Sequence, residues 1–213
     1  MPEFINFAHI YMVAMTELNT YINDADYSGA KNFMLKRGSK KVLSKKEYFV
    51  QQNAVSLYAA YIEEGIFHYT CAGEDGKEHV VGYSFENEFI CDYSSFIKGG
   101  CSLVSIRALT DCTIYTISLK DYLEYANEVQ DGLHFGFQVS NGLFEMCYKR
   151  LLALYCDTPE QRYVKLMKQC PTLKDKITLK EIASFLGVTP ETVSHIRKKI
   201  LNEQKKNLQN DLL

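Results

Sequence analysis

The sequence predicts an α+β protein: a small antiparallel β-barrel or jelly roll, then a long helix, then a helical C-terminal domain. Three observations lead to this expectation. Short apolar runs rich in β-branched and aromatic residues, separated by turn signals, fill residues 33–119. Apolar residues then recur at spacings of three and four as far as Tyr155, which is typical of a helix. Beyond Asp157 the chain contains capped helices joined by a turn with glycine.

Composition agrees with an ordinary globular protein. Hydrophobic residues make up 46% and charged residues 23% of the 213 residues, enough for one large or two small domains. The sequence has no apolar run of about 18 residues that would span a membrane. Its N-terminus lacks the basic start and apolar stretch of a secretory signal. We therefore expect a cytoplasmic protein with no membrane partner.

The cysteines do not indicate a metal site. There are seven of them, widely spaced and without a Cys-x-x-Cys pair, whereas zinc and iron–sulfur sites need several thiolates brought close together. Convergence in space stays open, but reduced and mostly buried thiols are the simpler interpretation. We expect no metal and no cofactor. The seven are Cys71, Cys91, Cys101, Cys112, Cys147, Cys156 and Cys170.

Charge is distributed unevenly along the chain. From Asp157 to the C-terminus there are 11 Lys and Arg against 7 Asp and Glu, whereas the preceding residues hold 13 basic and 19 acidic ones. A modestly basic C-terminal part on an acidic remainder indicates an anionic partner for that part.

The N-terminal domain is assigned to residues 1–119. Up to about Ala30 the chain is weakly helical, and from Phe33 to Leu119 we interpret it mainly as strands. Residues 55–62 and 112–117 are clear strand candidates, and residues 74–77, Glu-Asp-Gly-Lys, have the composition of a hairpin turn.

Residues 120–156 are interpreted as a long helical region. The helix is apolar on more than one face, so one face can lie on the barrel while another meets the same helix of a second subunit. A helix packed wholly inside one chain is the alternative. The residues predicted for the dimer contact are Val139, Leu143, Met146, Arg150 and Ala153.

The C-terminal domain is assigned to residues 157–213. Thr158 and Gln161 have the spacing of a capping box, with Pro159 at the first helical position, so a helix begins here. The tail from Lys205 onward is expected to fray.

The central part of this domain has the pattern of a helix-turn-helix. Thr178 and Glu181 form a second capping box, and Gly187 ends that helix because glycine tolerates the left-handed conformation. Thr189 then caps another helix, with Pro190 at its first position.

The second helix of this motif has an unusual polar face. Val193, Ile196 and Ile200 are expected to face inward, which leaves short polar residues near the N-terminus and cations further along. This order suits base contacts in a major groove flanked by phosphate contacts. An ordinary helical hairpin with a solvated face is the alternative, but it would favour long Lys and Glu side chains throughout.

The helix-turn-helix residues, together with the order of the predicted elements, support a family resemblance. Over about residues 30–205 the chain resembles the cyclic-AMP receptor protein and fumarate-nitrate reductase regulator family. The family's Glu-x-x-Ser-Arg motif corresponds to residues 191–195, with His195 at the arginine position, so the fork of bonds that arginine makes to guanine is lost. The resemblance implies a cyclic-nucleotide-binding-type barrel, a dimerisation helix and a winged helix that binds DNA. The implied DNA-binding residues are Thr178, Thr189, Pro190, Glu191, Thr192, Ser194, His195, Arg197, Lys198 and Lys199.

The resemblance also places an effector cassette in residues 87–108. The arginine that holds the cyclic phosphate in relatives falls on Ser102, so a buried phosphate would lack its counter-charge and cyclic AMP is not the expected effector. Glu88 is of the ribose-contacting type, but a solvated turn residue is the favoured interpretation. An axial haem ligand among His68, His79 and His134 has little support. The candidate effector residues are Glu88, Phe89, Lys98, Ser102, Leu103 and Arg107.

Two other classes of function are the alternatives to a DNA-binding regulator. A signal-binding module that has lost its DNA reader is the main rival. An enzyme has no positive support, because the sequence contains no P-loop, no Gly-x-Ser-x-Gly and no His-Glu-x-x-His. The expected partners are duplex DNA, a second copy of the chain, RNA polymerase in the case of activation, and an unidentified small-molecule effector.

Overall fold

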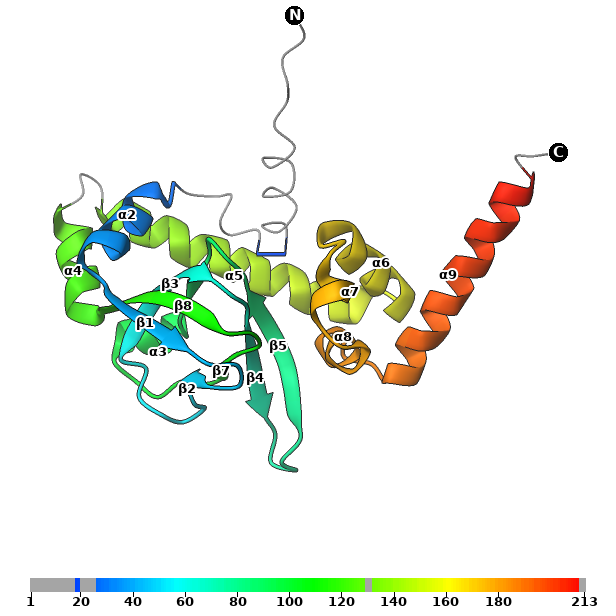
Figure 1. The fold of residues 1–213 in the computed structure, drawn as a ribbon, viewed down its shortest axis with the longest axis horizontal. Coiled ribbons are helices and arrows are strands. Elements are labelled where there is room, and N and C mark those ends of the chain that lie inside the picture. The colour runs from blue at the N-terminus through cyan, green and yellow to red at the C-terminus, as the bar shows by residue number, and fades with distance from the viewer. Residues whose placement is uncertain (1–17, 20–25, 129–131, 211–213) are drawn as a thin grey trace, which may run out of the picture. The chain divides into compact units, whose positions relative to one another are not determined.

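The computed structural model describes residues 18–19, 26–128 and 132–210 of the chain (Figure 1). The chain divides into a β-rich unit, residues 19–148, and a helical unit that contains the residues from 149 to the C-terminus.

The β-rich unit is a sandwich of two four-stranded antiparallel sheets. One sheet has the order β1-β8-β3-β6 and the other β2-β7-β4-β5. The expected fold is confirmed in its jelly-roll form, since no ladder joins the two sheets into a closed barrel among the described residues. The strands are β1 (Ser39–Leu43), β2 (Tyr48–Val50), β3 (Tyr58–Glu64), β4 (Phe67–Ala72), β5 (Glu78–Ser84), β6 (Phe89–Ile90), β7 (Ser105–Ala108) and β8 (Cys112–Ser118).

Alternating side chains of these strands form the core. Ile62, Phe67, Ile90, Ile106 and Ile114 are fully buried between the sheets, as expected for inward positions of period two. The strand predicted at residues 112–117 is confirmed as β8, and the run at 55–62 becomes a strand only from Tyr58.

The predicted hairpin turn at residues 74–77 is confirmed between β4 and β5. Gly76 adopts φ +73°, and its N–H donates to Gly73 O at 3.0 Å. A left-handed residue here is the role for which glycine is suited.

Among the described residues, four helices accompany the sandwich: α2 (Ser28–Arg37), α3 (Tyr93–Lys98), α4 (Leu119–Glu128) and α5 (Gly132–Cys156). The expectation of strand from Phe33 is wrong for residues 33–37, which complete α2. Met34 of this helix is buried in a second apolar cluster with Tyr61, Phe96 and Ile117, so packing of the helix decides its conformation.

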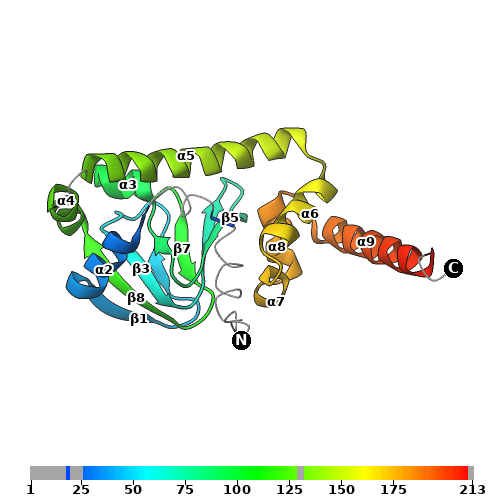
Figure 2. The same cartoon turned by 90° about the horizontal axis from the view of Figure 1, so that it is seen from above.

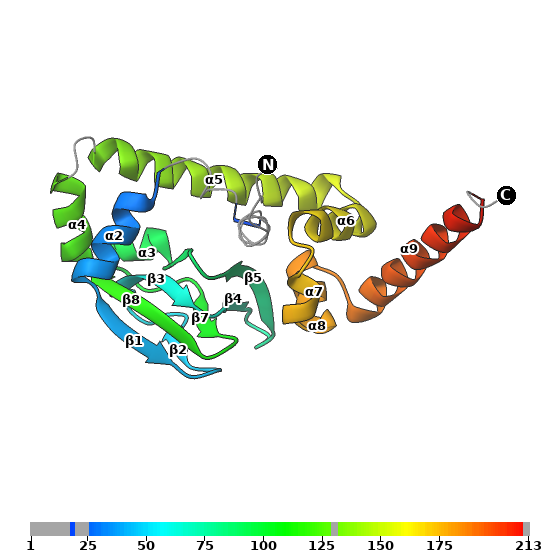
Figure 3. The ribbon, with the colours of Figure 1, turned by 45° about the horizontal axis from the view of Figure 1, so that its top comes forward.

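The helical region predicted for residues 120–156 is confirmed, as far as its residues are described, by α4 and α5. Figures 2 and 3 show the N-terminal half of α5 running beside α3, and Ser140 Oγ lies 3.4 Å from Tyr93 Oη. Within the described residues, no helix has the length and hydropathy needed to cross a bilayer.

All seven cysteines are thiols, but only Cys112 and Cys170 are buried. The expectation of mostly buried thiols is therefore wrong. Cys147 and Cys156 are exposed because they lie on the uncovered side of α5, and Cys101 is exposed on a loop.

The helical unit contains, after the end of α5, α6 (Pro159–Gln169), α7 (Leu173–Lys176), α8 (Leu179–Leu186) and α9 (Pro190–Asn210). The capping box predicted at Thr158 and Gln161 is present at the start of α6. The expected wing is corrected: residues 157–210 contain no strand, and α9 continues to Asn210 in place of a β-hairpin. Residues 201–210 are mostly good helix formers without β-branched residues, which favours this continuation. The fraying expected from Lys205 is likewise not seen as far as Asn210.

Candidate nucleic-acid interface

Helix α8 begins and ends as the sequence predicts. Thr178 Oγ1 accepts from the backbone N–H of Glu181 at 3.2 Å, and the Glu181 carboxylate accepts from Thr178 N at 2.8 Å. At the other end Gly187 adopts φ +67° and ψ +38°, and the N–H of Val188 donates to Ala183 O at 3.0 Å. These are a capping box and a Schellman-type ending, so both boundaries are local properties of the sequence.

The second helix of the motif begins at Pro190. The backbone N–H of Thr192 donates to Thr189 Oγ1 at 3.3 Å, which confirms Thr189 as the capping residue. Proline at the first helical position has no N–H to leave unsatisfied.

Apolar contacts between α8 and α9 fix the second helix in place. Ile182 and Ala183 of α8 are buried, as are Val193 and Ile196 of α9. Ala183 has no side chain beyond Cβ, which lets the two helices approach closely. The inward face predicted for the motif is confirmed, with Ile200 partly buried at its end.

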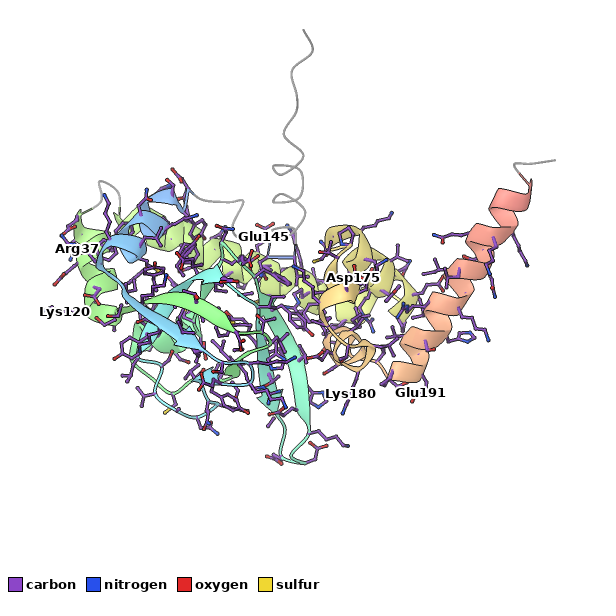
Figure 4. All side chains as sticks on the ribbon, in the orientation of Figure 1. Arg37, Lys120, Glu145, Asp175, Lys180 and Glu191 are labelled. Atoms are coloured by element: carbon purple, nitrogen blue, oxygen red, sulfur yellow. The ribbon has the colours of Figure 1, made fainter. Side chains whose placement is uncertain are left out.

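The opposite face of α9 is exposed. Glu191, Ser194, His195 and Lys198 lie on successive turns there, and all four are exposed. Figure 4 shows Glu191 at the beginning of α9, at the lower edge of the helical unit in that view. The remaining predicted DNA-binding residues comprise exposed Thr178, Thr189, Arg197 and Lys199 and partly buried Pro190 and Thr192.

The carboxylate of Glu191 is held in its ionised form. Hydrogen bonds from its own backbone N–H and from the Thr189 side chain lower the pKa of Glu191 below its usual range. An ionised carboxylate only accepts hydrogen bonds, which is what contact with a cytosine amino group requires.

Lys199 is already paired within the chain. Its Nζ lies 2.7 and 3.0 Å from the two carboxylate oxygens of Glu160 in α6, and this contact raises the pKa of Lys199. Lys199 therefore links α9 to α6, whereas the described residues show no ion pair for its neighbour Lys198.

Two arginines connect the motif to the preceding helices. Arg150, in the C-terminal third of α5, places its guanidinium 4.2 Å from the ring centroid of Phe185 in α8. Arg162 of α6 donates to Leu186 O at 3.2 Å and to Asp157 O at 2.7 Å. Sequence reasoning missed Arg162, because no local pattern shows which carbonyl oxygens a side chain will reach.

The candidate effector residues do not all come together. Phe89 lies in an aromatic group with Tyr27 and Tyr61, at centroid distances of 5.5 and 5.7 Å. Lys98 is exposed. Arg107 points elsewhere: its Nε donates to Nε2 of buried His68 at 3.0 Å.

Glu88 is a buried acid. It is 0% exposed, so its interpretation as a solvated turn residue is wrong. Oε2 accepts from Asn19 Nδ2 at 2.6 Å and from Phe85 N at 3.0 Å, while Oε1 has no hydrogen-bond partner among the described residues. Burial raises the pKa of Glu88 to about 8. The partner Asn19 is distant in sequence, which is why a turn-like Asn-Glu pattern gave no sign of it.

Ser102 and Leu103 lie beside an acid that sequence reasoning missed. Asp92 Oδ2 accepts from Leu103 N at 2.7 Å and lies 3.3 Å from Ser102 Oγ. Ser102 is 1% exposed. The position expected to hold a phosphate-binding cation therefore faces a carboxylate.

Comparison with known proteins agrees with this architecture. Residues 40–128 match the family model of the cyclic nucleotide-binding domain. FixK2 from Bradyrhizobium japonicum superimposes with a TM-score of 0.70 at 13% identity, over 78% of this chain and 86% of that one. A search of curated protein sequences finds no significant match.

Two further solved structures show the same fold. A CooA mutant from Carboxydothermus hydrogenoformans gives a TM-score of 0.64 at 21% identity, over 89% of this chain and 84% of that one. The c-di-GMP-responsive global regulator CLP from Xanthomonas campestris gives 0.65 at 15% identity, over 84% and 93%. The chain thus contains a cyclic nucleotide-binding domain, and the solved structures with its fold include a transcriptional regulator of the CRP/FNR family from Eubacterium rectale.

Proposed function

We propose that this chain, which has the fold of CRP/FNR transcription regulators, is a homodimeric regulator that binds duplex DNA sequence-specifically through α9. The main support for this proposal is that α9 has one buried face and one exposed polar face. Val193 and Ile196 are buried against the rest of the helical unit, while Glu191, Ser194 and His195 are exposed around the first turns. A helix held on one side, with short polar groups free near its N-terminus, suits insertion into a major groove.

Each exposed residue has a distinct role in this proposal. Glu191 accepts from a cytosine amino group, and Ser194 contacts a neighbouring base. His195 makes one hydrogen bond to guanine, so selectivity at that base is weaker than arginine would give. Arg197 and Lys198 contact phosphates and supply binding that is independent of sequence.

The dimer contact is proposed for a stripe on α5 that differs from the one expected from sequence. Val139 is only 7% exposed and so is covered within the chain, whereas a row of aromatic and leucine side chains along the helix is exposed. Their separations of seven, four, three and four residues fit the seam of a two-stranded coiled coil. We call this row the α5 stripe: Phe137, Phe144, Tyr148, Leu151 and Tyr155.

Pairing along the α5 stripe would present two copies of α9 to DNA. Their recognition sites would be centred roughly 34 Å apart, one helical turn of DNA, so the target would be an imperfect palindrome. An effector in the sandwich would act by shifting the balance between two arrangements of the dimer. RNA polymerase is the further partner that transcription activation would require.

Selection from a randomised duplex DNA pool at fixed moderate salt, followed by sequencing, tests whether α9 recognises base sequence. We expect a two-fold symmetric site to be enriched. The variant Glu191→Ala/Ser194→Ala should lose preference at particular bases, by about 1–3 kcal/mol for each contact removed. Glu203→Ala is the matched control, because Glu203 is an exposed acid further along the same helix. Unchanged base preference in the double variant would show that α9 is not the reader.

The dimer interface is tested by sedimentation velocity on variants of two leucines that are nearly equally exposed. Leu151 on the α5 stripe is 49% exposed and Leu123 on α4 is 50% exposed. Leu151→Glu should yield monomers, because two carboxylates would face each other in an apolar seam, whereas Leu123→Glu should remain dimeric. If both variants remain dimeric, the α5 stripe is not the interface.

The alternative function is a signal-binding module without DNA readout. Two features of the α8–α9 pair argue against this alternative. The pair is capped and packed as a helix-turn-helix, and the exposed face of α9 still has short polar residues near its N-terminus, which a chain that does not bind DNA would not need. A stable dimer that enriches no DNA sequence, with or without candidate ligands such as cyclic AMP, would favour this alternative.

A further inference from the structure

The cassette, residues 87–108, contains a carboxylate that gathers hydrogen-bond donors from two separate segments. Asp92 lies directly before α3. Its Oδ2 accepts from Ser95 Oγ at 2.9 Å on one side and from Leu103 N at 2.7 Å on the other. Leu103 is 11 residues further along, so the side chain of Asp92 closes the loop between β6 and β7.

Ser102 completes this arrangement. Its Oγ lies 2.7 Å from Val104 O and 3.3 Å from Asp92 Oδ2. A hydroxyl has one proton, and the shorter distance assigns it mainly to Val104 O. The firm donors to Asp92 are therefore the backbone N–H of Leu103 and the hydroxyl of Ser95.

The other side of the same loop is held by backbone pairing. Ser102 N donates to Ala54 O at 2.8 Å, and Asn53 N donates to Ser102 O at 2.8 Å. Ser56 N also donates to Gly100 O at 3.0 Å. With these bonds on one side and Asp92 on the other, the loop is ordered by contacts that the chain makes with itself.

Charge in the cassette opposes an anionic ligand. Ser102 stands where the resemblance places the phosphate-binding arginine. Among the described residues Asp92 makes no ion pair with a lysine or arginine, Lys98 is exposed, and Arg107 is engaged with His68. A phosphate entering here would meet the Asp92 carboxylate without a compensating cation, which is unfavourable in a partly buried site.

We propose that Asp92 is an internal substitute for an anionic ligand: its carboxylate occupies the donors of the cassette, so the domain adopts its ordered form without a bound phosphate. The domain therefore takes no anionic effector at this position. This inference rests on the sandwich and its family match, and it does not depend on DNA reading by α9.

The test combines removal of the carboxylate with chemical rescue. In Asp92→Ala the donors lose their acceptor, so the Tm of the full chain should fall by about 4 °C or more. Formate, a small carboxylate, is then titrated in place of chloride at constant ionic strength, and it should restore about half or more of the lost Tm by binding the folded form. Inorganic phosphate and cyclic AMP are tested on the wild-type chain by calorimetry.

Asp111→Ala is the matched control. Asp111 is an exposed carboxylate of the same domain that accepts from one backbone N–H, that of Lys45 at 2.8 Å, outside the cassette. We expect no rescue by formate in this variant and no binding of phosphate or cyclic AMP to the wild-type chain. The proposal is overturned if Asp92→Ala is as stable as wild type, if its loss of stability is not rescued by formate, or if the wild-type chain binds cyclic AMP with Kd below about 1 mM. DNA selection on the same protein reports separately on the α9 proposal.

Discussion

Replacement of Gly187 by alanine probes the turn that sets the angle between α8 and α9. Gly187 has φ +67°, in the left-handed region that residues with a Cβ avoid. A Cβ built there would lie 3.6 Å from Leu154 Cδ2, an ordinary van der Waals separation. Space for the methyl group is therefore available, and the loss of stability in Gly187→Ala comes from the left-handed backbone conformation.

The size of the effect follows from two opposing contributions. The left-handed conformation costs an alanine about 1–2 kcal/mol. Alanine also has less freedom than glycine in the unfolded chain, which offsets about 0.4–1 kcal/mol of this. Gly187→Ala should thus lower the free energy of unfolding by about 1 kcal/mol, and Gly187→Asn by less, because asparagine tolerates this region better.

Gly76 provides the matched control. It has φ +73° in the β4–β5 turn, and a Cβ at this residue would have no neighbouring atom within 4 Å among the described residues. Calorimetry should show similar destabilisation for Gly76→Ala and Gly187→Ala, each in its own unit. Only Gly187→Ala should weaken binding to a selected DNA duplex, by up to about tenfold, because relief of its strain turns α9 away from α8. Equal stability of Gly187→Ala and wild type, or equal loss of DNA affinity in both variants, would refute this reasoning.

Three other outcomes follow from the contacts. Lys198→Ala should reduce the salt dependence of DNA binding by about one phosphate contact, and Lys199→Ala should reduce it less, because Lys199 is paired with Glu160; equal slopes for both would contradict the pairing. Glu88 has a folded-state pKa of about 8, raised by burial above its unfolded value, so the folded form binds more protons and stability should fall as pH rises from about 4.5 to 8. Glu88→Gln should flatten this dependence in urea titrations at several pH values, and an unchanged slope would show that another group is responsible. Arg162→Lys cannot reach both carbonyl oxygens that Arg162 joins, and it should destabilise the helical unit by about 1–3 kcal/mol in thermal unfolding; wild-type stability would argue against that role.

The helix-turn-helix could be predicted residue by residue because its signals are local. The capping residues Thr178 and Thr189 each bond to the backbone N–H three positions away, and Gly187 meets a backbone requirement at its own position. The turn between β4 and β5 and the change from strand to helix near Ser118 are local in the same sense. Such features depend on neighbours in sequence, so the sequence alone determines them.

Tertiary structure decided which surfaces are covered and which polar groups meet. The periodicity of α5 shows that the helix is apolar on several sides, but only packing shows that Val139 is covered and Phe144 is exposed. Glu88 lies in a turn-like sequence and is nevertheless buried, and it accepts a hydrogen bond from Asn19, 69 residues away. The contact between Asp92 and Leu103 likewise depends on how α3 returns the chain to β7. Burial and hydrogen bonding between distant segments arise from the path of the whole chain, and no spacing in the sequence encodes them.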